Sequence, residues 1–483
     1  MPQEFSAYIA GKWTATAERR ELRAPFDGSH FATVHLAGSK ELEDAIAAGA
    51  RAAPAIAALS SYERSSILRS VAAGVRARRE ELALGMCYES GKPIGDAFAE
   101  VDRAEHCFEL AAAESERLYG EVIPLDLRPS SAGRWGLTRR FPLGLVAGIA
   151  PFNFPLNLAV HKIAPAMAAG CPIVLKPATQ TPTSTLRLAE IIDNTAWPKG
   201  GLSVVPSSRE AADVLTTDER IQLLSFTGSA EVGWRMKARA GKKRVVLELG
   251  GNAAAIVDES ADLAFAIPKL VYGAFSYAGQ KCISVQRIFV HSRLWDVFVP
   301  AFVEAARRVK LGDPRDPEVL LGPMIDEANA RRVDEWIDEA RRLGAEILLG
   351  GPRKGSLVPP TVLAKVPRAA RLDRQEAFGP TVNLVPVGSF DEAIAGVNDS
   401  DFGLQCGVFT RDLPHAWRAF ERISVGAVII NDAPSYRIDH MPYGGVKDSG
   451  FGREGIRYAM QDMTELRLMV VAMPPSVDFT NQD

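Results

Sequence analysis

Three reactive side chains lie in short turns next to predicted strands or helices. Cys282 lies in AGQKCIS, Glu248 follows the apolar run RVVL and precedes two glycines, and Asn153 lies between prolines in PFNFP. An ionised thiol is a nucleophile, and a carboxylate can take a proton from that thiol or from water. An amide N–H can stabilise an oxyanion by about 3 to 4 kcal/mol. Together these groups could attack a carbonyl carbon and form a covalent intermediate.

Each of these residues also has an ordinary structural explanation. Cys282 can be a small buried apolar residue, because this is the common environment of a free cysteine. Glu248 can be a capping or ion-paired glutamate, and Asn153 can satisfy the backbone of a turn. No single one of the three motifs therefore decides the chemistry.

A fourth motif suggests phosphate binding. In SFTGSAEVG, residues 225–233, a strand is followed by Thr-Gly-Ser and the start of a helix, which directs free backbone N–H groups at an anion. Lys176, in LKPAT, could reach a ribose or phosphate oxygen. A literal G-x-G-x-x-G occurs at 450–455, but it follows a loop rather than a buried strand, so we do not assign it as the cofactor turn.

The elements that must position these residues form a repeating pattern. From about residue 143, short β-rich runs alternate with amphipathic helical stretches, which is typical of a parallel sheet covered by helices on both faces. The pattern resumes after about residue 260 and predicts a second α/β domain. SREAADVLT and ADLAFAIPKLVYGAFSYAG are predicted as helices and CISVQRIFVH as a strand. Further helices are expected at 40–58, 61–89 and 94–118, and a final strand at ELRLMVVAM could pair with another subunit.

Composition places the chain among ordinary globular proteins. It has 483 residues, 47% of them hydrophobic and 24% charged, with a net charge of −3. This length predicts two or three domains, and the scattered Lys and Arg residues do not favour a nucleic-acid partner. Five widely spread cysteines do not suggest a disulfide framework, and the N-terminus does not resemble a signal peptide, so we expect a cytoplasmic protein.

Two further classes are not favoured by the sequence. The uncharged segment 141–160 is long enough to span a membrane, but three prolines within it would leave backbone groups unsatisfied in lipid. No HExxH, CxxC or P-loop motif is found, and the seven histidines do not cluster. We therefore expect neither a membrane partner nor a metal site.

Taken together, the motifs resemble the aldehyde dehydrogenase superfamily. PFNFP, KPA, FTGS, ELGGN, GQKC, EAFGP at 376–380 and PYGGVKDSGFGRE at 442–454 occur in that order over nearly the whole chain. By this resemblance Cys282 is the nucleophile, and Asn153 with the backbone N–H of Cys282 forms the oxyanion hole. Hydride then passes to NAD or NADP, and Glu248 activates the water that hydrolyses the thioester.

The resemblance also implies which residues hold the cofactor and how the domains are divided. Lys176 and Glu376 would hold ribose hydroxyls, Phe378 would pack near the nicotinamide, and Ser229 would meet the pyrophosphate. The implied cofactor positions are Lys176, Thr179, Gly228, Ser229, Glu376 and Phe378. The implied fold is α/β, with a Rossmann-type cofactor domain (1–122 and 143–249), an α/β catalytic domain (250–448) and a small β oligomerisation arm (123–142 and 464–483). The arm would give a homodimer or homotetramer.

Thr179 departs from the family pattern at the cofactor. Many NAD-preferring members carry a glutamate three residues after the lysine, and here that position is Thr179. Without a carboxylate to repel a 2′-phosphate, NADP should be tolerated or preferred.

A second departure concerns the substrate tunnel. Two positions that are often apolar in the family are Lys281 and His161 here, and Arg437 and Arg103 could also face the tunnel entrance. These cations favour an aldehyde with an anionic tail, although Arg103 and Arg437 could instead form surface salt bridges. The sequence is similar to the branch that includes succinate semialdehyde, lactaldehyde and phosphonoacetaldehyde dehydrogenases.

Two alternatives remain open at this point. A coenzyme-A-acylating member would resolve the thioester with a thiol, but such members typically lack the general base at Glu248. A non-catalytic relative that serves as a binding protein would tend to lose the nucleophile, and this chain retains Cys282.

Overall fold

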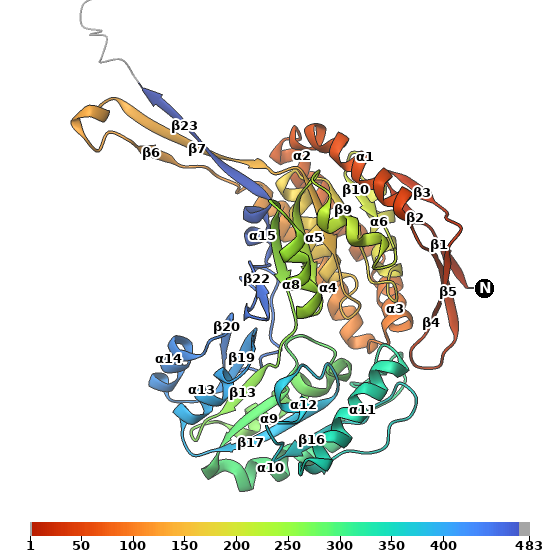
Figure 1. Cartoon of the computed structure of the whole chain (residues 1–483), viewed down its shortest axis with the longest axis vertical. Coiled ribbons are helices and arrows are strands. Elements are labelled where there is room, and N and C mark those ends of the chain that lie inside the picture. Colours follow the sequence, from red (N-terminus) through yellow and green to blue (C-terminus); the bar gives the residue numbers. More distant parts are fainter. Residues whose placement is uncertain (1, 473–483) are drawn as a thin grey trace, which may run out of the picture.

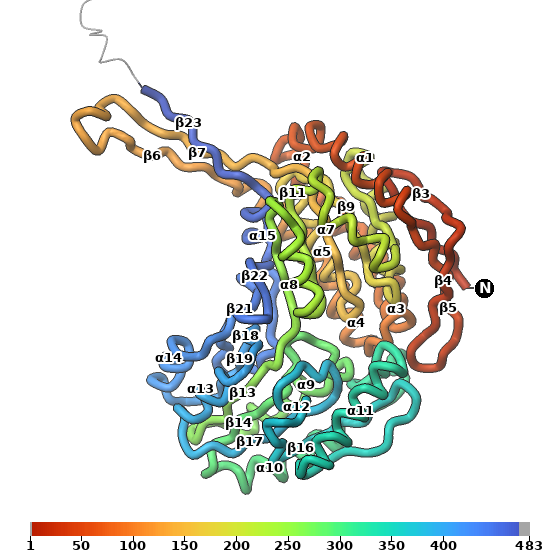
Figure 2. The backbone as a smooth tube through the Cα atoms, viewed as in Figure 1, coloured from red at the N-terminus to blue at the C-terminus, as the bar shows by residue number. Residues whose placement is uncertain are grey.

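The computed structural model describes residues 2–472. It consists of two α/β lobes that lie side by side and a thin three-stranded arm that projects from the first lobe (Figure 1). The chain crosses from the first lobe to the second after residue 248 and returns before residue 450 (Figure 2). Segments far apart in sequence therefore meet at the boundary between the lobes.

The first lobe is built on an eight-stranded sheet in the order β22-β12-β11-β8-β9-β10-β2-β3. Its five strands from β12 to β10 are parallel, and the runs in β8 and β9 are buried on both faces, as a helix-covered sheet requires. The strands are β2 (Ala7–Ile9), β3 (Lys12–Thr14), β8 (Leu145–Ile149), β9 (Ile173–Lys176), β10 (Leu202–Val204), β11 (Ile221–Thr227), β12 (Arg244–Glu248) and β22 (Gly450–Phe451).

Helices cover this sheet, and α5 (Asn157–Ala169) is buried along its whole length against α2, α4 and α15. The others are α1 (Ser39–Ala57), α2 (Ser61–Ala77), α3 (Arg79–Ser90), α4 (Ile94–Ser115), α6 (Thr183–Asp193), α7 (Val214–Thr217), α8 (Ala230–Arg239) and α15 (Ile456–Asp462). The single helix predicted over 61–89 is wrong. It is interrupted at Arg78, whose backbone is not helical and whose side chain pairs with Glu190 of α6.

The N-terminal strands were not expected from the sequence pattern. β1 (Gln3–Phe5), β5 (His30–His35) and β4 (Arg19–Arg23) form a separate small sheet in that order, while β2 and β3 extend the main sheet. These strands are short, and most residues of β4 are exposed, so hydrophobic alternation gives little signal.

The second lobe has a seven-stranded sheet in the order β15-β16-β17-β14-β13-β19-β20, parallel except for β15. Its strands are β13 (Ala254–Val257), β14 (Arg287–His291), β15 (Glu346–Leu349), β16 (Thr361–Ala364), β17 (Thr381–Val387), β19 (Gln405–Phe409) and β20 (Ala427–Ile430), with the small pair β18 (Phe402–Gly403) and β21 (Val446–Lys447) beside it. Its helices are α9 (Leu263–Phe275), α10 (Ser292–Arg307), α11 (Glu327–Arg342), α12 (Arg371–Arg374), α13 (Phe390–Asn398) and α14 (Leu413–Arg422).

The segment 276–286 differs from its prediction. The helix ends at Phe275, Tyr277 and Ala278 adopt positive φ angles of 52°, and the strand begins only at Arg287. The predicted helix SREAADVLT is likewise reduced to a 3-10 turn (Ala211–Asp213) followed by the single turn of α7. The segment around residue 282 is thus an irregular loop, which lets it face the first lobe.

The arm consists of β6 (Val122–Pro124), β7 (Arg134–Pro142) and β23 (Thr464–Ala472), with β7 and β23 paired antiparallel over their full length. Residues 473–483 of the predicted arm lie outside the described residues. The uncharged segment 141–160 is divided among the end of β7, strand β8 and the start of α5, and none of the described helices is long and apolar enough to cross a membrane.

Candidate active site

A cavity of about 520 Å³ lies at the carboxyl ends of the first lobe's strands, where the second lobe faces them. Parallel strands place the residues that follow them at one edge of a sheet, which is where α/β proteins bind ligands. The predicted site residues that line this cavity are Cys282, Glu248, Asn153, Lys176, Thr179, Gly228, Ser229, Glu376, Phe378 and Arg437. The three candidate catalytic groups are therefore brought together from three distant parts of the chain.

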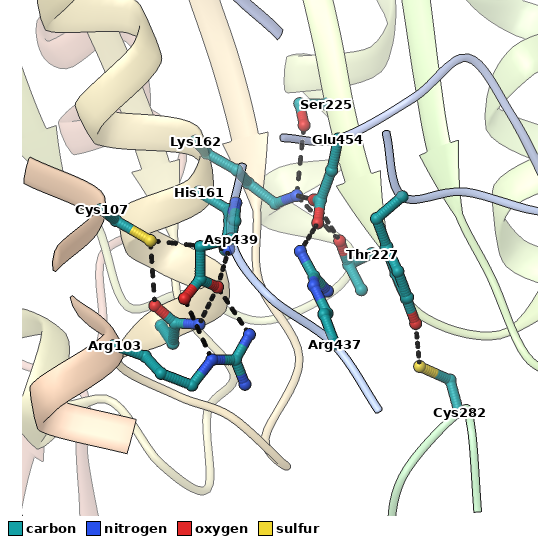
Figure 3. A network of polar contacts seen from close by, with 12 residues as sticks. Arg103, Cys107, His161, Lys162, Ser225, Thr227, Cys282, Arg437, Asp439 and Glu454 are labelled. Atoms are coloured by element: carbon teal, nitrogen blue, oxygen red, sulfur yellow. Dashed lines mark hydrogen bonds and ion pairs between the residues drawn. The ribbon is translucent and has the colours of Figure 1, made fainter. Parts of the chain in front are cut away.

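Cys282 lies in the irregular loop of the second lobe and is partly exposed to the cavity. Its Sγ is 2.9 Å from the phenol oxygen of Tyr443 (Figure 3). Burial raises the pKa of Cys282 to about 12, and the contact with Tyr443 acts in the opposite direction. Tyr443 was not among the predicted site residues, although it lies within the PYGG motif.

Glu248 is the last residue of β12, and its side chain is buried. Neither carboxylate oxygen accepts a hydrogen bond from any residue in the described part of the chain. Burial, and then the negative charge of Glu454, raise the pKa of Glu248 well above its usual range. A carboxyl group with a raised pKa is a stronger base once it has lost its proton.

Asn153 lies in the turn between β8 and α5, with only 4% of its surface exposed. Its Nδ2 donates to the carbonyl oxygen of Gln280, at 3.0 Å, which ties this turn to the loop that carries Cys282. An amide nitrogen carries two hydrogens, so this bond leaves a second N–H beside the cavity. The geometry is compatible with an oxyanion donor next to the thiol.

The opposite end of the cavity holds buried polar groups that suit a dinucleotide. Lys176 at the end of β9 donates to the carbonyl oxygen of Pro177, at 3.2 Å. Burial, and then the positive charge of Arg209, lower the pKa of Lys176 to about 8. Thr179 and Arg209 line the same end, and Arg209 was not predicted from the sequence.

Three further features fit this cofactor. Helix α8 starts after Gly228 and Ser229, and the Ser229 side chain makes no capping bond, so the helix presents free backbone N–H groups to an anion. Glu376 accepts from the backbone N–H of Gly251, at 2.9 Å, and burial raises its pKa to about 7. Phe378 packs edge-on against Phe152, with ring centroids 5.7 Å apart. These residues fit a nicotinamide dinucleotide.

A second, more open pocket of about 340 Å³ is lined by Arg103, Asp439 and their neighbours, and Arg437 lines both this outer pocket and the main cavity. The guanidinium carbon of Arg437 is 3.7 Å from the centroid of the Tyr443 ring, and its Nη2 donates to Glu454, at 3.0 Å. Lys162 also pairs with Glu454, at 3.1 Å. Arg437 is thus fixed where the two spaces meet.

Asp439 is the centre of the outer pocket's polar network (Figure 3). Its Oδ1 accepts from Arg103, at 2.6 Å, from His161, at 2.8 Å, and from Asn157, at 3.3 Å. Burial alone would raise the pKa of Asp439, but His161 and Arg103 hold it below its usual range. Asp439 was not predicted as a site residue.

Two of the four predicted substrate residues are not at the surface of either space. His161 lies on the buried helix α5 and is turned toward Asp439. Lys281 is buried and lines neither space, and its Nζ donates to Ser276 and lies over the ring of Tyr272. The surface salt-bridge alternative is wrong for Arg437, since its pair with Glu454 is buried.

Cys107, His161 and Asp439 form a group whose ligand atoms lie within 4.8 Å of one another. We assign no metal there, because Arg103 and His161 already donate to the same carboxylate oxygen. A cation would have to displace the Arg103 guanidinium.

Comparison with known proteins identifies relatives over the whole molecule. The model of the aldehyde dehydrogenase family matches residues 13–469. A 3-sulfolactaldehyde dehydrogenase of Priestia aryabhattai is 41% identical over 97% of this chain and 98% of its own. Aldehyde dehydrogenase 21 of Physcomitrella patens, solved with the reaction product succinate, matches with a TM-score of 0.96 and 46% identity, over 98% of this chain and 99% of that one. An NADP-dependent glyceraldehyde-3-phosphate dehydrogenase of Bacillus halodurans, solved with NADP, matches with a TM-score of 0.95 and 34% identity, over 98% and 100%.

Proposed function

The chain belongs to the aldehyde dehydrogenase family, and we propose that its substrate is a small aldehyde with an anionic group at the far end from the carbonyl. It is an NAD(P)-dependent oxidoreductase that acts on an aldehyde group. The substrate, the roles of individual residues and the oligomeric state are our proposals.

The position of Arg437 is the observation that carries the substrate proposal. Arg437 lines both the cavity that holds Cys282 and the outer pocket. Tyr443 contacts both groups, because its ring lies against the Arg437 guanidinium and its hydroxyl lies 2.9 Å from the sulfur. A substrate whose aldehyde carbon meets Cys282 would therefore bring a group a few atoms away close to Arg437. A guanidinium is well suited to bind a planar or tetrahedral anion.

The descriptions of two relatives support an anionic substrate for this chain. One is described as a 3-sulfolactaldehyde dehydrogenase, and another was solved with succinate. Candidates for this chain are thus succinate semialdehyde, 3-sulfolactaldehyde and phosphonoacetaldehyde. Lactaldehyde, a further candidate by the sequence resemblance, carries no charge and has the carbon chain of 3-sulfolactaldehyde, so it serves as a matched neutral probe.

We assign the chemistry to Cys282, Asn153 and Glu248, which line the main cavity of about 520 Å³, called the inner cavity below. The sulfur of Cys282 attacks the aldehyde carbon, and the oxygen that becomes negative is stabilised by the Asn153 amide and the backbone N–H of Cys282. A nicotinamide dinucleotide held by Lys176, Ser229 and Glu376 would supply the hydride acceptor, and oxidation of the carbon bonded to Cys282 would leave a thioester on this residue. Glu248, once ionised, takes a proton from the water that hydrolyses this thioester.

The cofactor end favours NADP over NAD. Thr179 places no carboxylate near the adenosine ribose, and Arg209 adds a cation beside Lys176. A 2′-phosphate carries negative charge, so these two features stabilise it.

Two alternative functions, coenzyme-A acylation and a purely binding role, differ from the proposed one in their need for Glu248 and Cys282. Resolution of the thioester by coenzyme A would not need Glu248, whereas this carboxyl group lines the cavity without a hydrogen-bond partner among residues 2–472. A purely binding role would not need an accessible thiol beside an amide donor. Incubation with coenzyme A, with detection of acyl-CoA instead of free acid, would favour the acylating alternative.

The arm and the domain division also remain proposals. Leu466, Leu468, Met469 and Val470 of β23 are each about half exposed on the projecting arm. Exposed apolar side chains on a strand of this kind favour contact with another copy of the chain, as a homodimer or homotetramer. Light scattering on the purified protein would test this.

Matched aldehyde pairs test the substrate proposal. We expect kcat/KM for 3-sulfolactaldehyde to exceed that for lactaldehyde, and kcat/KM for succinate semialdehyde to exceed that for butanal, by about tenfold or more, from one charge-assisted contact. Arg437→Met should remove most of this preference, measured as the ratio of kcat/KM for the anionic member of each pair to that for the neutral member, because any effect of the substitution on Cys282 itself lowers both members alike. Equal or better turnover of the neutral aldehydes by the unmodified enzyme would contradict the proposal.

A further inference from the structure

We propose that Tyr443 is a catalytic residue whose phenol O–H donates a hydrogen bond to the ionised sulfur of Cys282. This inference rests on the proposed role of Cys282 as the nucleophile. It concerns how that sulfur is activated, and it is independent of which aldehyde the enzyme uses.

The contact between the two side chains is close. Tyr443 Oη lies 2.9 Å from Cys282 Sγ, and within residues 2–472 this is the one hydrogen bond that the thiol makes. An ionised sulfur can only accept, so the phenol must be the donor in the reactive state. Glu248 lines the same cavity, but it makes no hydrogen bond with the thiol.

The phenol is held in place by its surroundings. The backbone of Tyr443 pairs with that of Glu454 in both directions, at 3.0 and 2.6 Å. Its ring is buried against Ile283 and Leu404 of the second lobe. Arg437 covers one face of the ring, and Glu454 fixes Arg437 in turn. The hydrogen bond therefore forms without a further loss of side-chain freedom.

The surroundings of Cys282 make such a donor useful. The titratable and charged groups that act on it are Tyr443, Glu376, Arg437 and Glu248, together with the adjacent Lys281, whose side chain points away from the cavity. Burial, the largest influence, raises the pKa of the thiol, and both carboxyl groups act in the same direction. Tyr443 and Arg437 oppose this effect. The thiol thus depends on few groups to ionise near neutral pH.

The proton and electron balance is simple. The thiol proton leaves to water, and the phenol keeps its own proton throughout. A sulfur lone pair then forms the C–S bond while the carbonyl π electrons move to oxygen. Negative charge leaves the sulfur in this step, so the phenol's hydrogen bond weakens as the bond to carbon forms.

The expected size of the effect follows from two opposing consequences. A hydrogen bond to an anion that favours ionisation by one pKa unit raises the thiolate fraction about tenfold below the pKa. The same bond makes each thiolate less nucleophilic, by about threefold for a Brønsted coefficient of 0.4 to 0.5. The net gain at neutral pH is therefore about threefold.

The test is the rate at which iodoacetamide, a neutral reagent, alkylates Cys282 in the full-length enzyme and in Tyr443→Phe between pH 6 and 10. We expect Tyr443→Phe to react about threefold more slowly throughout the rising part of the profile. Any levelling of its profile should lie at higher pH. Mass spectrometry of the Cys282 peptide assigns the reaction to this thiol. Superimposable profiles, or a faster variant, would overturn the proposal.

A matched control separates this effect from a loss of structure. Tyr8 is equally buried, and its phenol donates to Asp193, at 2.6 Å, in the N-terminal part of the first lobe. Tyr8→Phe should leave the alkylation profile unchanged. The Kd for NADP, measured by fluorescence, should be the same in Tyr443→Phe and the unmodified enzyme. A higher Kd in Tyr443→Phe would instead indicate that Tyr443 has a structural role. Alkylation does not involve an aldehyde, so it can succeed even if the substrate proposal fails.

Discussion

The inner cavity and the outer pocket differ in how their main polar groups are hydrogen-bonded within the protein. In the inner cavity, Glu248 has no hydrogen-bond partner among the described residues, and Lys176 donates only to a backbone carbonyl. In the outer pocket, Asp439 accepts hydrogen bonds from three side chains, those of Arg103, His161 and Asn157. The two regions are adjacent, and Arg437 lines both.

This difference separates reactivity from selectivity. A buried polar group without a partner destabilises the fold by about 1 to 3 kcal/mol, so it is retained where a ligand or reactant uses it. Paired charges hold their positions in the absence of ligand and set the local potential. Substitutions in the inner cavity should therefore affect all aldehydes alike, whereas those in the outer pocket should act on anionic aldehydes alone.

The largest effect is expected at Cys282. Cys282→Ala should lower kcat/KM for every aldehyde by a factor on the order of 10⁴ or more, because the covalent route is lost. Cys406→Ala is the control, since Cys406 is buried in β19 away from both spaces. Substantial residual turnover in Cys282→Ala would contradict the role of the inner cavity as the site of the covalent step.

The next largest effect is expected at Glu248. Glu248→Gln should lower the steady-state rate by about 10²- to 10³-fold, because the hydrolytic water loses its base. The first turnover should still release reduced cofactor as a rapid burst, measured by stopped-flow absorbance. Because the carboxyl group must lose its proton to act, the steady-state rate of the unmodified enzyme should rise with pH through the raised pKa of Glu248, and the variant's profile should be flatter. A burst that falls as much as the steady-state rate would place Glu248 in the first step instead.

A smaller change is expected at the cofactor end of the inner cavity. Thr179→Glu should lower kcat/KM with NADP by about tenfold, because the new carboxylate repels the 2′-phosphate, and should change NAD little. Thr179→Gln introduces a side chain of the same shape without the charge. It should leave the ratio of kcat/KM with NADP to kcat/KM with NAD nearly unaltered. An equal loss in both variants would show a steric effect and not an electrostatic one.

The smallest effect is expected in the outer pocket. Asp439→Asn removes a negative charge that partly neutralises Arg103 and faces the incoming anion. KM for succinate semialdehyde should fall by about threefold, and KM for butanal should stay the same. If both values change equally, the outer pocket does not discriminate by charge.

The sequence was most informative about the site residues that lie at the carboxyl ends of predicted strands. Lys176, Thr227 and Glu248 follow or end parallel strands of one sheet, so periodicity and local motifs were enough to place the residues near them at one edge. The helix break at Arg78 and the irregular loop 276–286 depend on packing between elements, and hydrophobic periodicity does not report this.

The partners of the reactive groups were the least predictable. Tyr443 contacts Cys282 across 161 positions of the sequence, and Asp439 contacts Arg103 across 336. Lys281 is adjacent to the nucleophile in sequence, yet its side chain points away from the cavity toward Ser276. Such directions are set by tertiary structure, because neighbouring residues in an irregular loop follow no fixed period.

The convergence of Cys282, Glu248 and Asn153 on one carbonyl group is tested most directly by trapping the acyl-enzyme. Glu248→Gln is mixed with succinate semialdehyde and NADP, quenched in acid during the burst, digested and analysed by mass spectrometry. We predict a succinyl group on the peptide that contains Cys282, in an amount equal to the reduced cofactor formed. Reduced cofactor without any acyl group on that peptide, or an acyl group on another cysteine, would contradict the account.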